Sequence, residues 1–252
     1  MYRYTAIFRS ICWIGFFSII LASWWYLFNM SQMSGLTFAG KSVRTNMMNM
    51  NTFGTLFPMW SIMMLAMMLP TLVPTLQSYE DLMKSADGTR IGWFGVTVGF
   101  VFVWILVATI LATFQLLLLW LGLINLLGVS TSIWITAFFL VIVGSFQFTS
   151  IKNTCHAICY SPFNYFLKNW RLGFYGGFRM GSGLGLYCVG CCWGFMVLGF
   201  VGGTMNLLWM GLATFLMVLE KLPQVGSYFA KPIGVTLVLG GLFITARAIN
   251  VI

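Results

Sequence analysis

Residues 91–121 read IGWFGVTVGFVFVWILVATILATFQLLLLWL, an apolar run that contains no charged side chain. A helix needs about 20 mainly apolar residues to cross the roughly 30 Å hydrocarbon core of a bilayer. The run is therefore long enough for a membrane-spanning helix that tilts or extends past the bilayer. This stretch predicts the fold class, an all-α polytopic membrane helix bundle.

The composition of the whole chain points the same way. Of its 252 residues, 60% are hydrophobic and only 7% are charged, whereas an ordinary soluble domain carries about 25% charged residues. So few charges cannot cover the surface of a soluble enzyme or keep a chain disordered. The net charge of +9 is better explained by loops that face anionic lipid than by nucleic acid, so the lipid bilayer is the expected partner and no nucleic acid is expected.

Similar apolar runs predict about seven transmembrane helices in a single membrane domain over residues 1–252. The expected spans cover residues 10–28, 56–77, 91–121, 132–149, 183–201, 205–219 and 232–249. Two polar stretches separate spans: a Met- and Asn-rich outer loop at about 29–57, and a basic, aromatic cytoplasmic segment at about 150–182. No stretch is polar and long enough for a separate soluble domain.

The basic residues predict the orientation. With seven spans, ten of the thirteen Lys and Arg residues fall on the side of the N-terminus, and only Lys41, Arg44 and Arg247 fall on the other. Cytoplasmic loops carry the excess of positive charge in membrane proteins. The N-terminus is therefore expected in the cytoplasm and the C-terminus outside, in a multi-pass protein of a bacterial cell inner membrane.

Five of the six cysteines form two groups that both fall near the expected cytoplasmic face. The groups are Cys155, His156 and Cys159, and Cys188, Cys191 and Cys192. Residues spaced i, i+3 or i, i+4 share one face of a helix. Two helices can therefore present a four-sulfur site, in which His156 can replace one sulfur. Such soft ligands suit copper, zinc or an iron–sulfur cluster.

Cysteine also has simpler roles. A free cysteine is a small hydrophobic residue that is common in buried positions, and this is the expected role of Cys12. Cys191 and Cys192 can equally be packing residues beside Gly190 and Gly194. A disulfide between the two groups is disfavoured by their expected cytoplasmic location.

A stripe of methionines offers a weaker, second metal site. Met63 and Met67 are spaced i, i+4 in the expected second span, and thioethers are ligands for Cu(I). The stripe lies in the outer half of the membrane, apart from the thiols. The alternative is packing, because methionine fills irregular gaps in cores.

Several kinds of machinery are missing from the sequence. No carboxylate lies inside a span, which disfavours a proton-coupled pump, and no P-loop is present. A single histidine excludes bis-histidine haem ligation and multi-histidine copper centres. With no serine hydrolase motif either, the sequence does not indicate an enzyme. Glu220 and Lys221 are expected to form a local ion pair.

Five segments together carry a family resemblance. They are MMLAMMLP at 63–70, KNTCHAIC at 152–159, GLYCVGCCW at 185–193, FVGGTMNLLWM at 200–210 and Glu220-Lys221. The chain resembles, over about residues 60–242, a prokaryotic family of predicted metal-binding integral membrane proteins of unassigned function. The resemblance implies a metal-binding role for Cys155, Cys159, Cys188, Cys191 and Cys192.

The leading hypothesis is soft-metal handling or delivery through the cysteine groups, with copper first and zinc second. A metal-requiring membrane enzyme or other membrane subunits would then be the protein partners. A second hypothesis is a structural or assembly subunit of a larger membrane complex, because Gly-rich faces and aromatics suit helix–helix and lipid contacts. A third is a membrane thiol redox protein.

Overall fold

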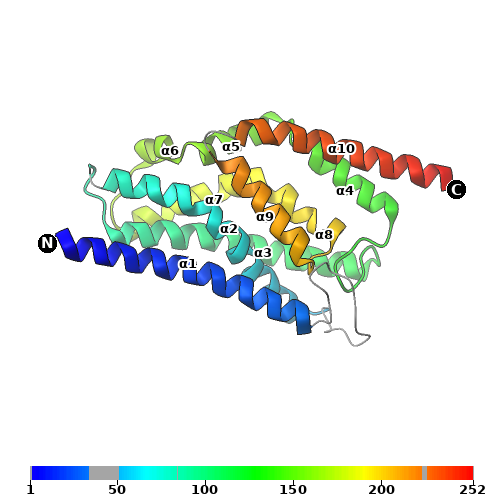
Figure 1. Ribbon diagram of the computed structural model, residues 1–252, viewed down its shortest axis with the longest axis horizontal. Coiled ribbons are helices and arrows are strands. Elements are labelled where there is room, and N and C mark those ends of the chain that lie inside the picture. The colour runs from blue at the N-terminus through cyan, green and yellow to red at the C-terminus, as the bar shows by residue number, and fades with distance from the viewer. Residues whose placement is uncertain (1, 34–50, 84, 223–225, 252) are drawn as a thin grey trace.

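The computed structural model describes residues 2–33, 51–83, 85–222 and 226–251, and this part of the chain is almost entirely helical (Figure 1). It confirms the all-α fold class. Most of the expected outer loop lies outside the described residues. The helices are α1 (Tyr2–Met33), α2 (Phe53–Met83), α3 (Arg90–Trp120), α4 (Ile133–Phe146), α5 (Ser150–Tyr160), α6 (Pro162–Asn169), α7 (Gly173–Val197), α8 (Gly199–Gly202), α9 (Leu207–Lys221) and α10 (Gly226–Val251).

Five helices in the described residues are long and apolar enough to cross a membrane. They are Arg9–Met33, Phe53–Met83, Arg90–Trp120, Gly173–Gly202 and Tyr228–Ile249. A sixth results if α4 and α5, which meet at a bend of 64°, form one broken span. The remaining expected span, the sixth at 205–219, corresponds to α9, a helix of 15 residues. At 1.5 Å per residue it is about 22 Å long, shorter than the roughly 30 Å hydrocarbon core.

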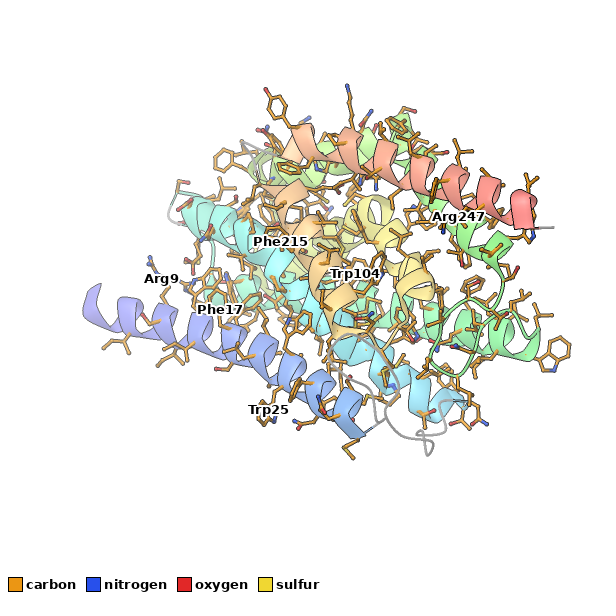
Figure 2. All side chains as sticks on the ribbon, turned by 45° about the vertical axis from the view of Figure 1, so that its right-hand side comes forward. Arg9, Phe17, Trp25, Trp104, Phe215 and Arg247 are labelled. Atoms are coloured by element: carbon orange, nitrogen blue, oxygen red, sulfur yellow. The ribbon has the colours of Figure 1, made fainter. Side chains whose placement is uncertain are left out.

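The helices form a bundle whose perimeter is apolar. In Figure 1, α1 lies along one edge and the α4–α10 pair along the opposite edge, with α2, α3, α7 and α9 between them. Phe17, Trp25 and Phe215 are exposed on the outside, whereas Trp104 is buried (Figure 2). Such a surface is compatible with contact to lipid tails. The start of α1 and the end of α10 lie at opposite ends of the bundle (Figure 1).

Helix α2 continues through three prolines, and a side chain of α1 compensates for the backbone hydrogen bond that Pro70 removes. Pro70 has no N–H to donate to the carbonyl of Ala66, and Trp24 Nε1 of α1 donates to that carbonyl instead, at 3.1 Å. Satisfying freed backbone groups in this way is what allows proline inside membrane helices.

Helices α3 and α7 pack backbone to backbone, and this contact fixes the helix that carries three of the cysteines. Gly95 and Gly99 of α3 face Gly177 and Gly181 of α7 so closely that a Cβ atom on any of them would overlap a backbone atom of the other helix. Small residues at every fourth position permit this approach in membrane helices. The glycine-rich run therefore positions the cysteine helix against the core.

Replacing Gly181 by leucine is expected to destabilise the bundle strongly. A Cβ at this position would overlap the Val96 carbonyl oxygen, and a carbonyl in the middle of α3 cannot move aside. Overpacking of this kind costs about 1–3 kcal/mol or more, so the midpoint of thermal unfolding in detergent should fall. Gly240→Leu is the matched control, since nothing lies within 4 Å of the Cβ position there. An unchanged midpoint in Gly181→Leu would refute this account of the packing.

Candidate metal centre

Helix α7 brings three cysteines to one buried face. Cys188, Cys191 and Cys192 have 1–3% of their surface exposed, and their three sulfur atoms all lie within 4.8 Å of one another. The Cys191 and Cys192 sulfurs are 3.3 Å apart. The Cys191 thiol also lies 3.2 Å from the Cys188 carbonyl oxygen, to which it can donate. This is the group of potential soft ligands that the i, i+3, i+4 spacing predicted.

Helix α5 supplies a fourth sulfur. Thr149 caps its first turn, and the bend between α4 and α5 turns the helix so that it packs on α7. Cys159, near its end, is buried and places its sulfur 3.8 Å from that of Cys191. The four-sulfur cluster, Cys159, Cys188, Cys191 and Cys192, therefore combines one cysteine of the first group with the three cysteines of the second.

A buried lysine completes the cluster. The Lys221 ammonium, at the end of α9, lies 2.9 Å from the Cys188 sulfur and donates to the Thr71 hydroxyl at 2.9 Å. The side chain is 6% exposed, and its Nζ lies 5.9 Å from the centre of the Phe100 ring. The ion pairs in the described residues are Arg90–Glu80 and Lys152–Glu220, and neither includes Lys221.

This arrangement has an electrostatic consequence. A buried ammonium without a counter-charge is strongly unfavourable, and the anionic form of Cys188 is the nearest group that can balance it. A thiolate, rather than a thiol, binds metal. Lys221 therefore favours the metal-binding form of Cys188, and it also offsets negative charge when several thiolates share one cation.

Glu220 has a different partner from the one expected. It does not pair with its neighbour Lys221. Its carboxylate instead forms a buried ion pair with Lys152 of α5, with a shortest N–O distance of 2.8 Å. Adjacent positions on a helix point about 100° apart, so the two side chains of α9 reach different helices. The Lys152–Glu220 pair ties α5 to α9 beside the four-sulfur cluster.

His156 and Cys155 lie outside the four-sulfur cluster. His156 Nε2 is 2.6 Å from the Glu220 carbonyl oxygen, and because a carbonyl only accepts, this nitrogen donates and satisfies the last turn of α9. The Cys155 sulfur lies against Gly190, about 150° around α7 from the face of the cluster. It lines a pocket of about 810 Å³.

The sequence did not predict two residues of this site, Lys221 and Thr71. Lys221 was expected to pair locally with Glu220, and Thr71 carried no signal of its own. The register of α9 contained a usable signal, because Met210, Met217 and Lys221 are spaced i, i+7 and i+11 on one helix face. Which residues contact that face, however, depends on how α2, α7 and α9 pack together.

Four buried sulfurs and one buried cation form a candidate soft-metal site inside a helix bundle. A comparison with protein families supports this class: the family model described as PpoB2, copper chaperone, matches residues 57–244. The chain belongs to this family. Searches of curated proteins and of solved structures give no match.

Proposed function

We propose that this protein is a membrane-embedded copper chaperone that binds Cu(I) in the four-sulfur cluster and passes it to a copper-requiring partner. The observation that carries the proposal is the meeting of Cys159 on α5 with Cys188, Cys191 and Cys192 on α7, all buried. Buried thiols are inert in most proteins, but four of them at contact distance beside an ammonium form a ligand set. Copper chaperone is also the description of the family.

The description of the family favours copper over zinc. The ligands alone do not separate the two metals, because thiolates select Cu(I) and Zn(II) alike and four sulfur atoms also match a tetrahedral zinc site. Two or three thiolates satisfy Cu(I), and its single charge leaves an anionic complex that Lys221 can stabilise. Under this proposal Cys155 and His156 are not ligands of the cluster, since their side chains have other neighbours.

The setting of the cluster supports delivery within the membrane. Its ligands lie on α5 and α7, which belong to or adjoin candidate spans, and the outer surface of the bundle is apolar. Copper held here would be shielded from water and from soluble thiols. A membrane enzyme that requires copper, in the bacterial inner membrane, is the recipient that this location suggests.

Two cysteines on one helix provide the matched test. We expect Cys159→Ser to lower the affinity for Cu(I) at least about tenfold, because it removes a soft ligand, and Cys155→Ser to leave it unchanged. Affinity is measured anaerobically on the detergent-purified protein by competition with a chromogenic Cu(I) chelator. Equal affinities for wild type and both variants would contradict the proposal.

The same preparations separate the other hypotheses. Tight binding of Zn(II) with no measurable binding of Cu(I) would make zinc the cargo. Purification of a stable multi-protein particle without metal affinity would favour an assembly subunit instead. The six cysteines are free thiols in the structure. Trapping of a mixed disulfide with one of them would favour the thiol redox protein, because copper binding does not require such a disulfide.

A further inference from the structure

A second group of sulfur atoms lies deeper along the same helices. Met63 and Met67 of α2, Met196 of α7 and Met210 of α9 line one narrow gap, together with Phe195, Trp209 and three smaller residues. All four methionines are buried. The space left between them is about 10 Å³, close to the minimum that holds a single water-sized particle. We call these four residues the thioether pocket.

The thioether pocket is connected to the four-sulfur cluster by helix register. Residues at i, i+4 and i+7 or i+8 stay on one helix face, and each of the three helices carries such a stripe from the pocket to the cluster. The stripes are Met63, Met67 and Thr71 on α2, Met196, Cys192 and Cys188 on α7, and Met210, Met217 and Lys221 on α9.

Side-chain contacts fix both ends of these stripes. At one end the methionines of α2, α7 and α9 share the pocket, and at the other Lys221 contacts both Thr71 and Cys188. Between them, Met217 is fully buried. Eight residues of helix separate Met196 from Cys188, so the two sites lie about 12 Å apart.

We propose that the thioether pocket is a second, weaker Cu(I) site, and that Met217 and Cys192 connect it to the four-sulfur cluster as a path through the bundle. This inference rests on the proposed copper function and adds the route within the protein. Thioethers bind Cu(I) without losing a proton and without adding charge. A neutral site that holds the ion loosely is suited to transfer, whereas the charged thiolate cluster is suited to retention.

Methionine packing is the competing explanation, and α2 provides a matched control for it. Met64 and Met68 lie on the same helix and are equally buried, but they line a different gap beside Phe100 and Trp104 of α3. Because they line this other gap, they have no part in the proposed copper path. Leucine preserves most of the volume of methionine while removing the sulfur.

The test is Cu(I) titration of detergent-purified full-length protein, with copper alone as the probe. We expect wild type and Met64→Leu/Met68→Leu to bind about two equivalents, one tightly and one weakly. Met63→Leu/Met67→Leu/Met210→Leu should keep the tight equivalent and lose the weak one. Cys159→Ser/Cys188→Ser/Cys191→Ser/Cys192→Ser should keep the weak one, with an affinity that does not change with pH because no thiol of the cluster remains to ionise.

The outcomes separate this inference from the proposed function. Retention of the tight equivalent shows that the triple methionine variant is folded. If that variant still binds two equivalents, the thioether pocket is packing only, and the copper function stands. If the cysteine variant binds no Cu(I), the pocket is not a site of its own. If wild type binds no Cu(I) at all, both proposals are wrong.

Discussion

Lys221→Met is expected to weaken Cu(I) binding about a thousandfold. The ammonium lies 2.9 Å from the Cys188 sulfur and is buried, so it stabilises the negative charge of a copper–thiolate complex. At about 4 Å and an effective dielectric constant of about 20, one such interaction amounts to about 4 kcal/mol, which corresponds to roughly three decades of affinity. Competition with a Cu(I) chelator measures the change.

Lys231→Met is the control for total charge. Lys231 also belongs to the last part of the chain but is exposed on α10, and its loss should leave the affinity for Cu(I) unchanged. If both lysine variants lower the affinity equally, general attraction by the positive chain explains the effect, and the specific role of Lys221 is wrong. Thr71→Val is expected to have a smaller effect in the same direction, because it removes only a hydrogen-bond acceptor of the ammonium.

Glu220→Gln is expected to destabilise the protein by about 3–5 kcal/mol, because it leaves the buried ammonium of Lys152 without its partner. Both side chains of this pair are nearly inaccessible to solvent. The double variant Glu220→Gln/Lys152→Met should be more stable than Glu220→Gln alone, since no uncompensated charge remains. Unfolding in detergent, followed by loss of helical signal, provides the measurement.

The other ion pair of the described residues, Arg90–Glu80, serves as the control for Glu220→Gln. Arg90 and Glu80 are both more exposed than Lys152 and Glu220, so solvent screens their interaction. Glu80→Gln should therefore cost clearly less than Glu220→Gln. Equal losses in the two variants would contradict the importance that we assign to burial of the α5–α9 pair.

Much of the fold follows from local sequence. The length of the apolar runs predicted the long helices. Helix α3, Arg90–Trp120, covers almost the whole of the run 91–121, because nothing in that run favours a break. The number of spans depended on more than hydropathy. Residues 205–219 are apolar enough for a span, but α9 is confined between the turn at Gly203 and its end at Lys221.

The candidate site was predicted where spacing was sufficient, and missed where it depended on packing. The spacing of Cys188, Cys191 and Cys192 alone places them on one face, and the structure brings Cys159 to them. Cys155 and Cys159 are also spaced i, i+4, as Cys188 and Cys192 are. The Cys155 sulfur nevertheless lies against Gly190, outside the cluster. Which side of α5 meets α7 is set by the bend after α4 and by the Lys152–Glu220 pair, and neither follows from sequence spacing.

X-ray absorption at the copper edge tests the central claim most directly. Detergent-purified protein loaded with one equivalent of Cu(I) should show sulfur as its only ligand type. In Cys188→Ser/Cys191→Ser/Cys192→Ser this thiolate signal should disappear, leaving only the weakly bound copper of the thioether pocket. Cys12→Ser, which removes a buried cysteine of α1, should give the wild-type spectrum. Nitrogen or oxygen ligands in wild type, or an unchanged spectrum in the triple variant, would show that the four-sulfur cluster does not hold the metal.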